Sequence, residues 1–167
     1  GADAILLMAS MPITKKQTKV IFDLATDLGM DVLCEVHSKK EIEKIPTKAI
    51  IYGVNSRKFK TSHASWRYAV SRLIGRYSGI LGVGTVRDLS TDLSVFRQLI
   101  DELPKNAETI AESGVKPSQI SEIREIGFDC ALIGTALLQS PSGVRKSLEQ
   151  FSAALEPKGA VDGAPIA

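Results

Sequence analysis

Short apolar runs that alternate with helix-like segments constrain the fold of this chain more than any other feature. The runs occupy residues 4–8, 31–37, 50–55, 109–111 and 131–134. Helical patterns occupy residues 14–28, 38–45, 93–103, 117–126 and 142–155. Near-continuous apolar strands separated by helices are typical of a parallel sheet covered by helices. Both a doubly wound sheet and a (β/α)8 barrel fit this alternation.

Glycine and proline mark several of the predicted helix boundaries. Gly29 follows the helical pattern at residues 14–28 and is a typical stop signal. Pro117 and Gly127 flank another helical pattern, and proline suits the first helical turn while glycine suits the position after the last.

Length and composition indicate a single globular domain. The chain has 167 residues, of which 44% are apolar and 24% charged. These values exclude collagenous and largely disordered chains, and no run approaches the roughly 18 apolar residues of a membrane span. We assign residues 1–155 to the domain and expect the Gly-, Ala- and Pro-rich tail at residues 156–167 to be disordered. The start lacks an initiator Met and the basic stretch of a signal peptide, so we expect a chain cut from a longer protein.

The charges of the chain are unevenly distributed, although the net charge is only +2. Nine Lys and Arg residues and no Asp or Glu occur from Lys44 to Arg87, while the remainder is net negative. A basic middle flanked by acidic ends predicts a site for an anion or a surface for an acidic partner. We expect a small-molecule anion, with no nucleic-acid partner and no membrane partner.

The two cysteines, Cys34 and Cys130, lie in strand-like runs without the spacing of a metal site. We therefore expect reduced, buried thiols in a cytoplasmic protein, and no metal site. Side chains alternate along a strand, so Glu35 and His37 share one face while Cys34 takes the other. Cys34 is expected to pack against helices.

Polar side chains follow three of the predicted strands at their carboxyl ends. They are Glu35, Asn55, Arg57, Glu112 and Ser113. In a parallel barrel these ends converge on one mouth, where active sites are built. Carboxylates, an amide and a guanidinium there suit acid–base chemistry on an anionic substrate. The alternative is that each residue caps a neighbouring helix or forms a surface ion pair.

Two glycine-containing turns each follow a strand and precede a helix. One contains Ser113 and Gly114, and the other contains Gly134 and Thr135. Glycine lets backbone N–H groups approach an anion closely, and barrel enzymes often bind phosphate with the loops after their last two strands. The pair of turns, one strand–helix unit apart, predicts a phosphate site.

Five short motifs occur in order along the chain and carry a family resemblance. They are GADAILL (1–7), DVLCEVH (31–37), GVNSR (53–57), AESGV (111–115) and ALIGT (131–135). With these motifs the sequence resembles the carboxy-terminal five strand–helix units of indole-3-glycerol-phosphate synthase. That enzyme of tryptophan biosynthesis is a (β/α)8 barrel, so the resemblance implies a partial TIM barrel.

The resemblance also implies roles for individual residues. Glu35 matches the acid–base carboxylate of ring closure and dehydration, and Asn55 and Glu112 match two further catalytic residues of the site. Arg57 and Ser113 match substrate-binding residues. Gly114, Gly134 and Thr135 match the phosphate-binding turns. The family converts 1-(2-carboxyphenylamino)-1-deoxyribulose 5-phosphate to indole-3-glycerol phosphate, carbon dioxide and water, without metal or organic cofactor.

The chain departs from the family pattern in two places. Gly1 aligns with the start of the fourth strand, so strands one to three and their catalytic lysines have no counterpart. We therefore expect the chain alone to be inactive and the missing amino-terminal barrel segment to be its partner. Residues 61–87 form an insertion whose apolar and basic spacing predicts an amphipathic helix, either a lid over the substrate or a surface helix on the barrel rim.

Two other functions are weighed against the synthase. A different phosphosugar barrel, such as an isomerase or epimerase, would share the phosphate turns but leaves Glu35, Asn55 and Arg57 unexplained. A non-catalytic remnant that binds phosphate, or an interaction module that uses the basic helix, is the alternative from another class.

Overall fold

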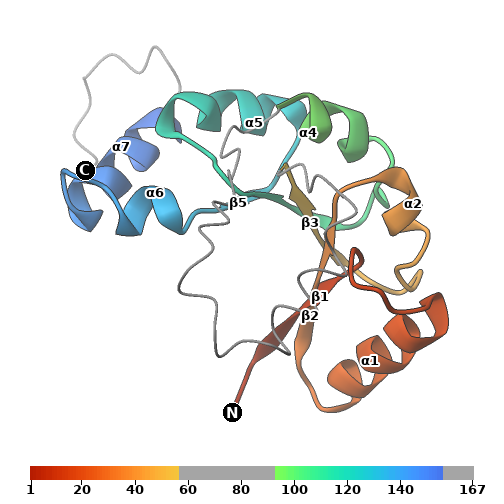
Figure 1. Ribbon diagram of the computed structural model, residues 1–167. Coiled ribbons are helices and arrows are strands. Elements are labelled where there is room, and N and C mark those ends of the chain that lie inside the picture. Colours follow the sequence, from red (N-terminus) through yellow and green to blue (C-terminus); the bar gives the residue numbers. More distant parts are fainter. Residues whose placement is uncertain (57–92, 156–167) are drawn as a thin grey trace, which may run out of the picture.

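A parallel sheet of five strands forms the centre of the computed structural model, which describes residues 1–56 and 93–155 (Figure 1). The strands are β1 (Ala4–Met8), β2 (Asp31–Val36), β3 (Ile51–Asn55), β4 (Glu108–Glu112) and β5 (Cys130–Leu132). Every neighbouring pair is parallel, and the spatial order β1-β2-β3-β4-β5 is the order along the chain. A doubly wound sheet reverses its strand order at a switch point. The unreversed order seen here therefore indicates a barrel and excludes a doubly wound sheet.

The described helices all lie on the convex side of the curved sheet (Figure 1). They are α1 (Lys15–Asp27), α2 (Lys39–Ile42), α4 (Leu93–Ile100), α5 (Ile120–Ile126), α6 (Thr135–Leu138) and α7 (Val144–Leu155), with a 3-10 turn, η1 (Pro117–Gln119), before α5. The predicted fold class, a partial (β/α)8 barrel, is confirmed. The short α6 was not predicted from the sequence.

Local capping explains where two of these helices begin and end. At the start of α1, Thr14 Oγ1 accepts a hydrogen bond from the backbone N of Gln17, and Gln17 Oε1 accepts one from the backbone N of Thr14. This reciprocal pair satisfies two amide groups that the first helical turn leaves without partners. At the end of α5, Gly127 has φ 112°, a left-handed conformation that glycine adopts without steric cost.

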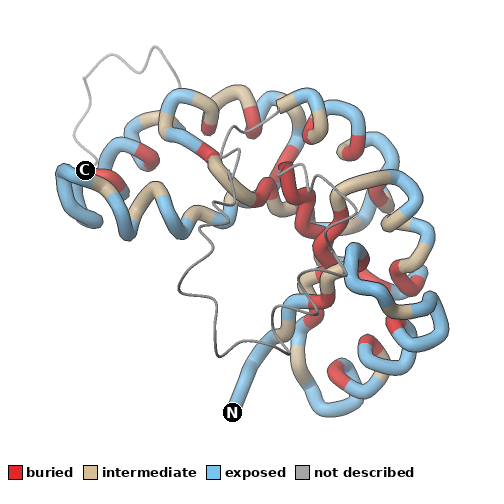
Figure 2. Tube along the Cα trace, viewed as in Figure 1, coloured by how far each residue is buried: buried red, intermediate tan, exposed pale blue. Residues whose placement is uncertain are grey.

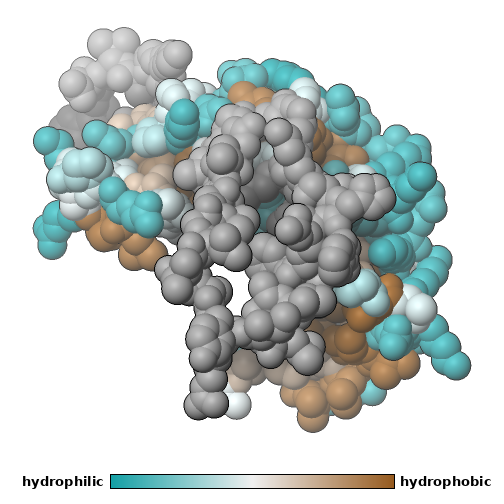
Figure 3. Space-filling view, viewed as in Figure 1, coloured by the Kyte–Doolittle hydropathy of each residue, from teal (hydrophilic) through white to brown (hydrophobic). Residues whose placement is uncertain are grey.

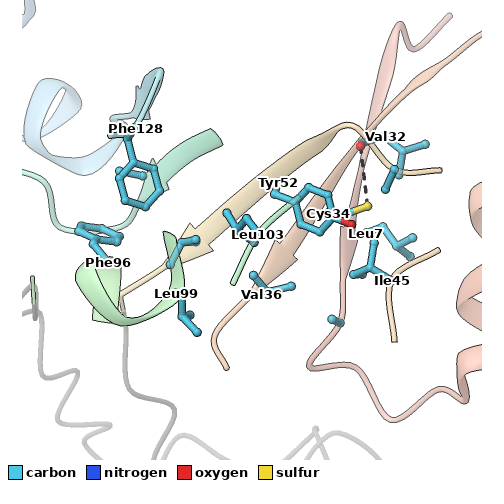
Figure 4. Packing of buried hydrophobic residues seen from close by; sticks show 14 of the residues in the cluster. Leu7, Val32, Cys34, Val36, Ile45, Tyr52, Phe96, Leu99, Leu103 and Phe128 are labelled. Atoms are coloured by element: carbon cyan, nitrogen blue, oxygen red, sulfur yellow. Dashed lines mark hydrogen bonds between the residues drawn. The ribbon is translucent and has the colours of Figure 1, made fainter. Parts of the chain in front are cut away.

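The core lies between the convex face of the sheet and the helices (Figure 2). Buried strand residues on this face include Cys34, Val36, Tyr52 and Val54. Figure 4 shows Tyr52 beside Leu103. Further along the core, the rings of Phe96 and Phe128 meet edge to face with centroids 5.1 Å apart (Figure 4). The strand residues that alternate with these side chains project toward the concave face.

The two cysteines occupy different environments. Cys34 is buried as expected, and burial raises the pKa of its thiol to about 12. The expectation of a buried Cys130 is wrong, because this thiol is exposed. Cys130 pairs in register with Ile110 and so lies on the concave face of β5, a strand with a neighbour on one side only in the described sheet.

Some sequence-based expectations lie outside the described residues. The insertion at residues 61–87, the tail at residues 156–167 and Arg57 belong to this group. Among the helices that are described, none combines the length and the apolar character that crossing a membrane requires.

Matched leucine truncations test the assignment of the core. Leu99 of α4 is 6% exposed and Leu138 of α6 is 78% exposed. We expect Leu99→Ala to lower the free energy of unfolding by about 2–5 kcal/mol, because it removes buried methyl groups and leaves a cavity. Leu138→Ala should change it by less than about 0.5 kcal/mol. Denaturant unfolding of both variants measures this difference, and equal losses would contradict the assigned core.

Candidate active site

The carboxyl ends of the central strands bring three of the predicted site residues onto the concave face. Glu35 in β2 lies opposite Gly53 in β3, and Asn55 at the end of β3 lies opposite Glu112 at the end of β4. Residues in register across a sheet project to the same side, so the carboxyls and the amide share one face. Glu35 and Glu112 are only 4% and 3% exposed, although both can ionise.

The carboxyl groups of Glu35 and Glu112 form a pair within this buried region. Burial, a hydrogen bond with Glu35 and the charge of Glu35 together raise the pKa of Glu112 to about 8. Two ionised carboxylates only accept hydrogen bonds, so a hydrogen bond between them requires a proton on one. Near neutral pH the pair therefore holds a carboxyl that can donate a proton and a carboxylate that can accept one.

His37 extends the cluster beyond the end of β2. Its Nε2 lies 3.5 Å from Glu35 Oε1, and its Nδ1 lies 3.2 Å from Glu41 Oε2. The backbone N of His37 also donates to Glu41 Oε2 at 2.7 Å. Glu41 thus fixes the imidazole against Glu35. Sequence reasoning missed Glu41, although its position four residues after His37 was a usable signal.

Ser56 joins the ends of β3 and β4. Its backbone N donates to the Glu112 carbonyl at 3.2 Å, and its Oγ donates to the Ser113 carbonyl at 2.9 Å. Directly after β4, Ser113 and Gly114 have φ 71° and 67°, so the chain turns through two successive residues in the left-handed conformation. For serine this conformation is uncommon, and the anchored carbonyls help to hold it.

The second predicted turn lies beside the first. Gly134 and Thr135 follow β5, which pairs with β4 through Glu112 and Leu132. Thr135 begins α6, and the Gly134 carbonyl accepts backbone hydrogen bonds from Leu137 and Leu138, both at 3.0 Å. Both turns are therefore at the carboxyl edge of the sheet. Arg57 is not described, so its place relative to these turns stays a prediction.

The described part of the chain contains no group of three or more His, Cys, Asp or Glu side chains arranged to hold a metal ion. Carboxyl and imidazole groups among the described side chains can give and take protons.

The raised pKa of Glu112 predicts a pH-dependent stability. Its ordinary value is 4.5, so the protonated group favours the folded chain, and this contribution is lost as pH rises from 4.5 through about 8. We expect Glu112→Gln to gain stability relative to the parent chain across this window, by about 1.4 kcal/mol per unit of pKa shift. Denaturant unfolding between pH 4 and 9 measures the gain, with the exposed Glu125→Gln as a control. A difference that stays flat with pH would contradict the buried pair.

Solved structures support the fold. The chain resembles 3-hexulose-6-phosphate synthase from Salmonella typhimurium with a TM-score of 0.58 and 13% identity, covering 93% of this chain and 62% of that chain. It resembles thiamine phosphate pyrophosphorylase from Pyrococcus furiosus with a TM-score of 0.55 and 16% identity, covering 92% and 59%. At such low identity the likeness concerns the fold alone.

Curated relatives share more of the sequence. Proteins named indole-3-glycerol phosphate synthase from Lachnospira eligens and Paenarthrobacter aurescens are both 31% identical, over 84% and 92% of this chain. The matches cover 45% and 47% of those proteins, so the chain spans about half the length of these relatives.

A family model matches almost the whole described region. The model is that of indole-3-glycerol phosphate synthase, and it matches residues 1–73 and 77–151. These segments contain the buried carboxyl pair and both turns at the carboxyl edge of the sheet. Together with the relatives, this match shows that the chain belongs to the indole-3-glycerol phosphate synthase family.

Proposed function

We propose that this chain forms the part of an indole-3-glycerol-phosphate synthase that carries its acid–base carboxylate. The substrate would be 1-(2-carboxyphenylamino)-1-deoxyribulose 5-phosphate, and the products indole-3-glycerol phosphate, carbon dioxide and water. The buried pair of Glu35 and Glu112 at the barrel mouth is the observation that carries this proposal. Family membership and the neighbouring turns support it.

The reaction needs groups that can give and take protons. Ring closure joins the aromatic ring to the ribulose carbonyl carbon, the aromatic carboxylate leaves as carbon dioxide, and the former carbonyl oxygen leaves as water. Glu35 is proposed as the acid–base group of these steps, because it shares a buried region with a second carboxyl that retains its proton near neutral pH. Asn55 and Glu112 are proposed to line the site beside it.

The substrate carries two anionic ends, and the proposal assigns each to a different part of the site. Ser113, Gly114, Gly134 and Thr135 would donate hydrogen bonds to the sugar and its phosphate. Arg57 would hold the aromatic carboxylate, since a guanidinium can bind a carboxylate through two parallel hydrogen bonds. No metal or organic cofactor is part of the proposal.

The proposed activity needs the part of the relatives that this chain does not cover. One end of the curved sheet carries apolar surface over α1, where Val20, Leu24 and Leu28 are exposed (Figure 3). At this end β1 has a strand neighbour on one side only within the described sheet. The proposed partner is the amino-terminal barrel segment, whose strand would pair with β1 and whose helix would cover α1. A cytoplasmic location is proposed with it.

A barrel that joins this chain to the amino-terminal half of the Paenarthrobacter aurescens relative tests the function. We expect the joined protein to form indole-3-glycerol phosphate and the isolated chain to form none. Glu35→Gln should lower kcat about 10²-fold or more, because glutamine cannot transfer the proton. The exposed Glu125→Gln is the matched control and should retain activity. An inactive joined barrel that still binds phosphate would favour the non-catalytic alternative, and an active Glu35→Gln would move the proton transfer elsewhere.

The phosphate site can be tested on the chain itself. A side chain added at Gly134 meets nothing within 4 Å, so Gly134→Val should fold. It should nevertheless weaken binding of ribulose 5-phosphate at least about tenfold, because the added methyl groups occupy the approach to the backbone N–H groups. Calorimetric titration measures the affinity, with the exposed Gln139→Val at the other end of α6 as the control. Equal affinity of the Gly134 variant and the parent would place the phosphate elsewhere.

A further inference from the structure

Gly53 occupies the position in β3 that lies between the two buried carboxyl groups. It is in register with Glu35 on one side and with Ile110, two residues before Glu112, on the other. A Cβ atom built on Gly53 would lie 1.8 Å from Glu112 Oε1 and 2.7 Å from Glu112 Cδ. The Glu112 carboxyl therefore occupies the space that any other residue would fill with its side chain.

The backbone of Gly53 does not explain why glycine stands here. Its φ lies outside the left-handed range that favours glycine, and the residue forms part of an ordinary parallel strand. Glycine inside a strand carries a conformational cost and packs no side chain, so a different requirement must offset that cost. The approach of the Glu112 carboxyl supplies that requirement.

The open space determines which way Glu112 turns. Its carboxyl lies over Gly53, the residue of β3 that is in register with Glu35. Glu35 Oε1 and Glu112 Oε1 are both buried and have no hydrogen-bond partner among the other described residues. A proton held between the two carboxyls supplies a donor in this region shielded from water, where His37 Nε2, 3.5 Å from Glu35 Oε1, is the neighbouring polar group.

We propose that Gly53 is a positioning residue for the acid–base pair: its missing side chain lets the Glu112 carboxyl lie against Glu35, where the two share one proton. The part that concerns catalysis rests on the proposed function. The glycine thereby sets the proton-donating state of the pair without touching the substrate.

The groups that face the pair are few within the described chain. His37, which follows β2, faces Glu35, and Glu41 of α2 lies behind the imidazole. The register partners from β1, β3 and β5 are Met8, Asn55 and Leu132, which are uncharged. Among the described groups, a change in the titration of Glu112 therefore reports on the carboxyl pair and its imidazole neighbour.

A carbon-13 NMR titration of the glutamate carboxyl carbons in the full chain tests the positioning directly. Gly53→Ala should lower the pKa of Glu112 from about 8 by at least about one unit, because the added methyl group moves its carboxyl away from Glu35 and toward water. Val54→Ala is the matched control, since Val54 is buried on the opposite face of the same strand. Val54→Ala should lower the free energy of unfolding but leave the pKa of Glu112 unchanged. An unchanged Glu112 titration in Gly53→Ala would overturn the proposal.

A second variant decides the case in which Gly53→Ala does not fold. Combining it with Glu112→Ala removes the carboxyl that the new methyl group meets at 1.8 Å. The remaining close atom, Leu33 Cδ1 at 3.2 Å, is the end of a side chain that needs to shift by only a few tenths of an ångström, so the double variant should regain the thermal stability of Glu112→Ala alone. Failure of the double variant to recover would show that Gly53 serves another purpose.

Kinetics in the joined barrel separate the inference from the proposed function. Gly53→Ala should lower kcat at least about tenfold and shift the pH profile, with little change in KM, and Val54→Ala should keep the parent profile. A joined barrel without activity would refute the proposed function, while the titration still decides the role of Gly53. If the joined barrel is active and Gly53→Ala changes neither its kcat nor its pH profile, the catalytic part of the inference is refuted.

Discussion

Parallel pairing of the strands in chain order determines the rest of this structure. A right-handed connection between neighbouring parallel strands places its helix on one particular side, and repeating the same step from β1 to β5 keeps every described helix on that side. The convex face of the sheet then supplies the hydrophobic core. The concave face is left free of described helices, so the polar residues at the strand ends can build a site there.

Because the parallel strand order separates the core from the concave face, the fold can accommodate a buried carboxyl pair. Glu35 and Glu112 project away from the core, so their desolvation does not disturb the packing of Cys34, Tyr52 and Val54 on the other face. One face of the sheet stabilises the chain, while the other face carries the buried carboxyl groups of β2 and β4, whose desolvation costs stability. Burial of acid groups of this kind is typical of catalytic sites.

How far the sequence predicts this structure depends on the distance between the residues involved. Apolar runs and alternation along single strands predicted the five strands and the face of Glu35, because both are local properties. The exposure of Cys130 was mispredicted, since it depends on which strands stand beside β5. The contact of Glu35 with Glu112 was not predicted either, because it depends on register across β3 and on the space above Gly53. The roles of the site residues stay predictions.

Ser56 has a consequence for how chains of this family can vary in length. Its hydrogen bonds to the Glu112 and Ser113 carbonyls fasten the end of β3 to β4 before the chain continues to residues 57–92. The strand ends that carry the carboxyl pair are therefore joined upstream of that connection. As a general rule, each doubling of loop length costs only about 0.6 kcal/mol of closure entropy. Evolution can thus lengthen or shorten the chain after Ser56 while the acid pair keeps its geometry.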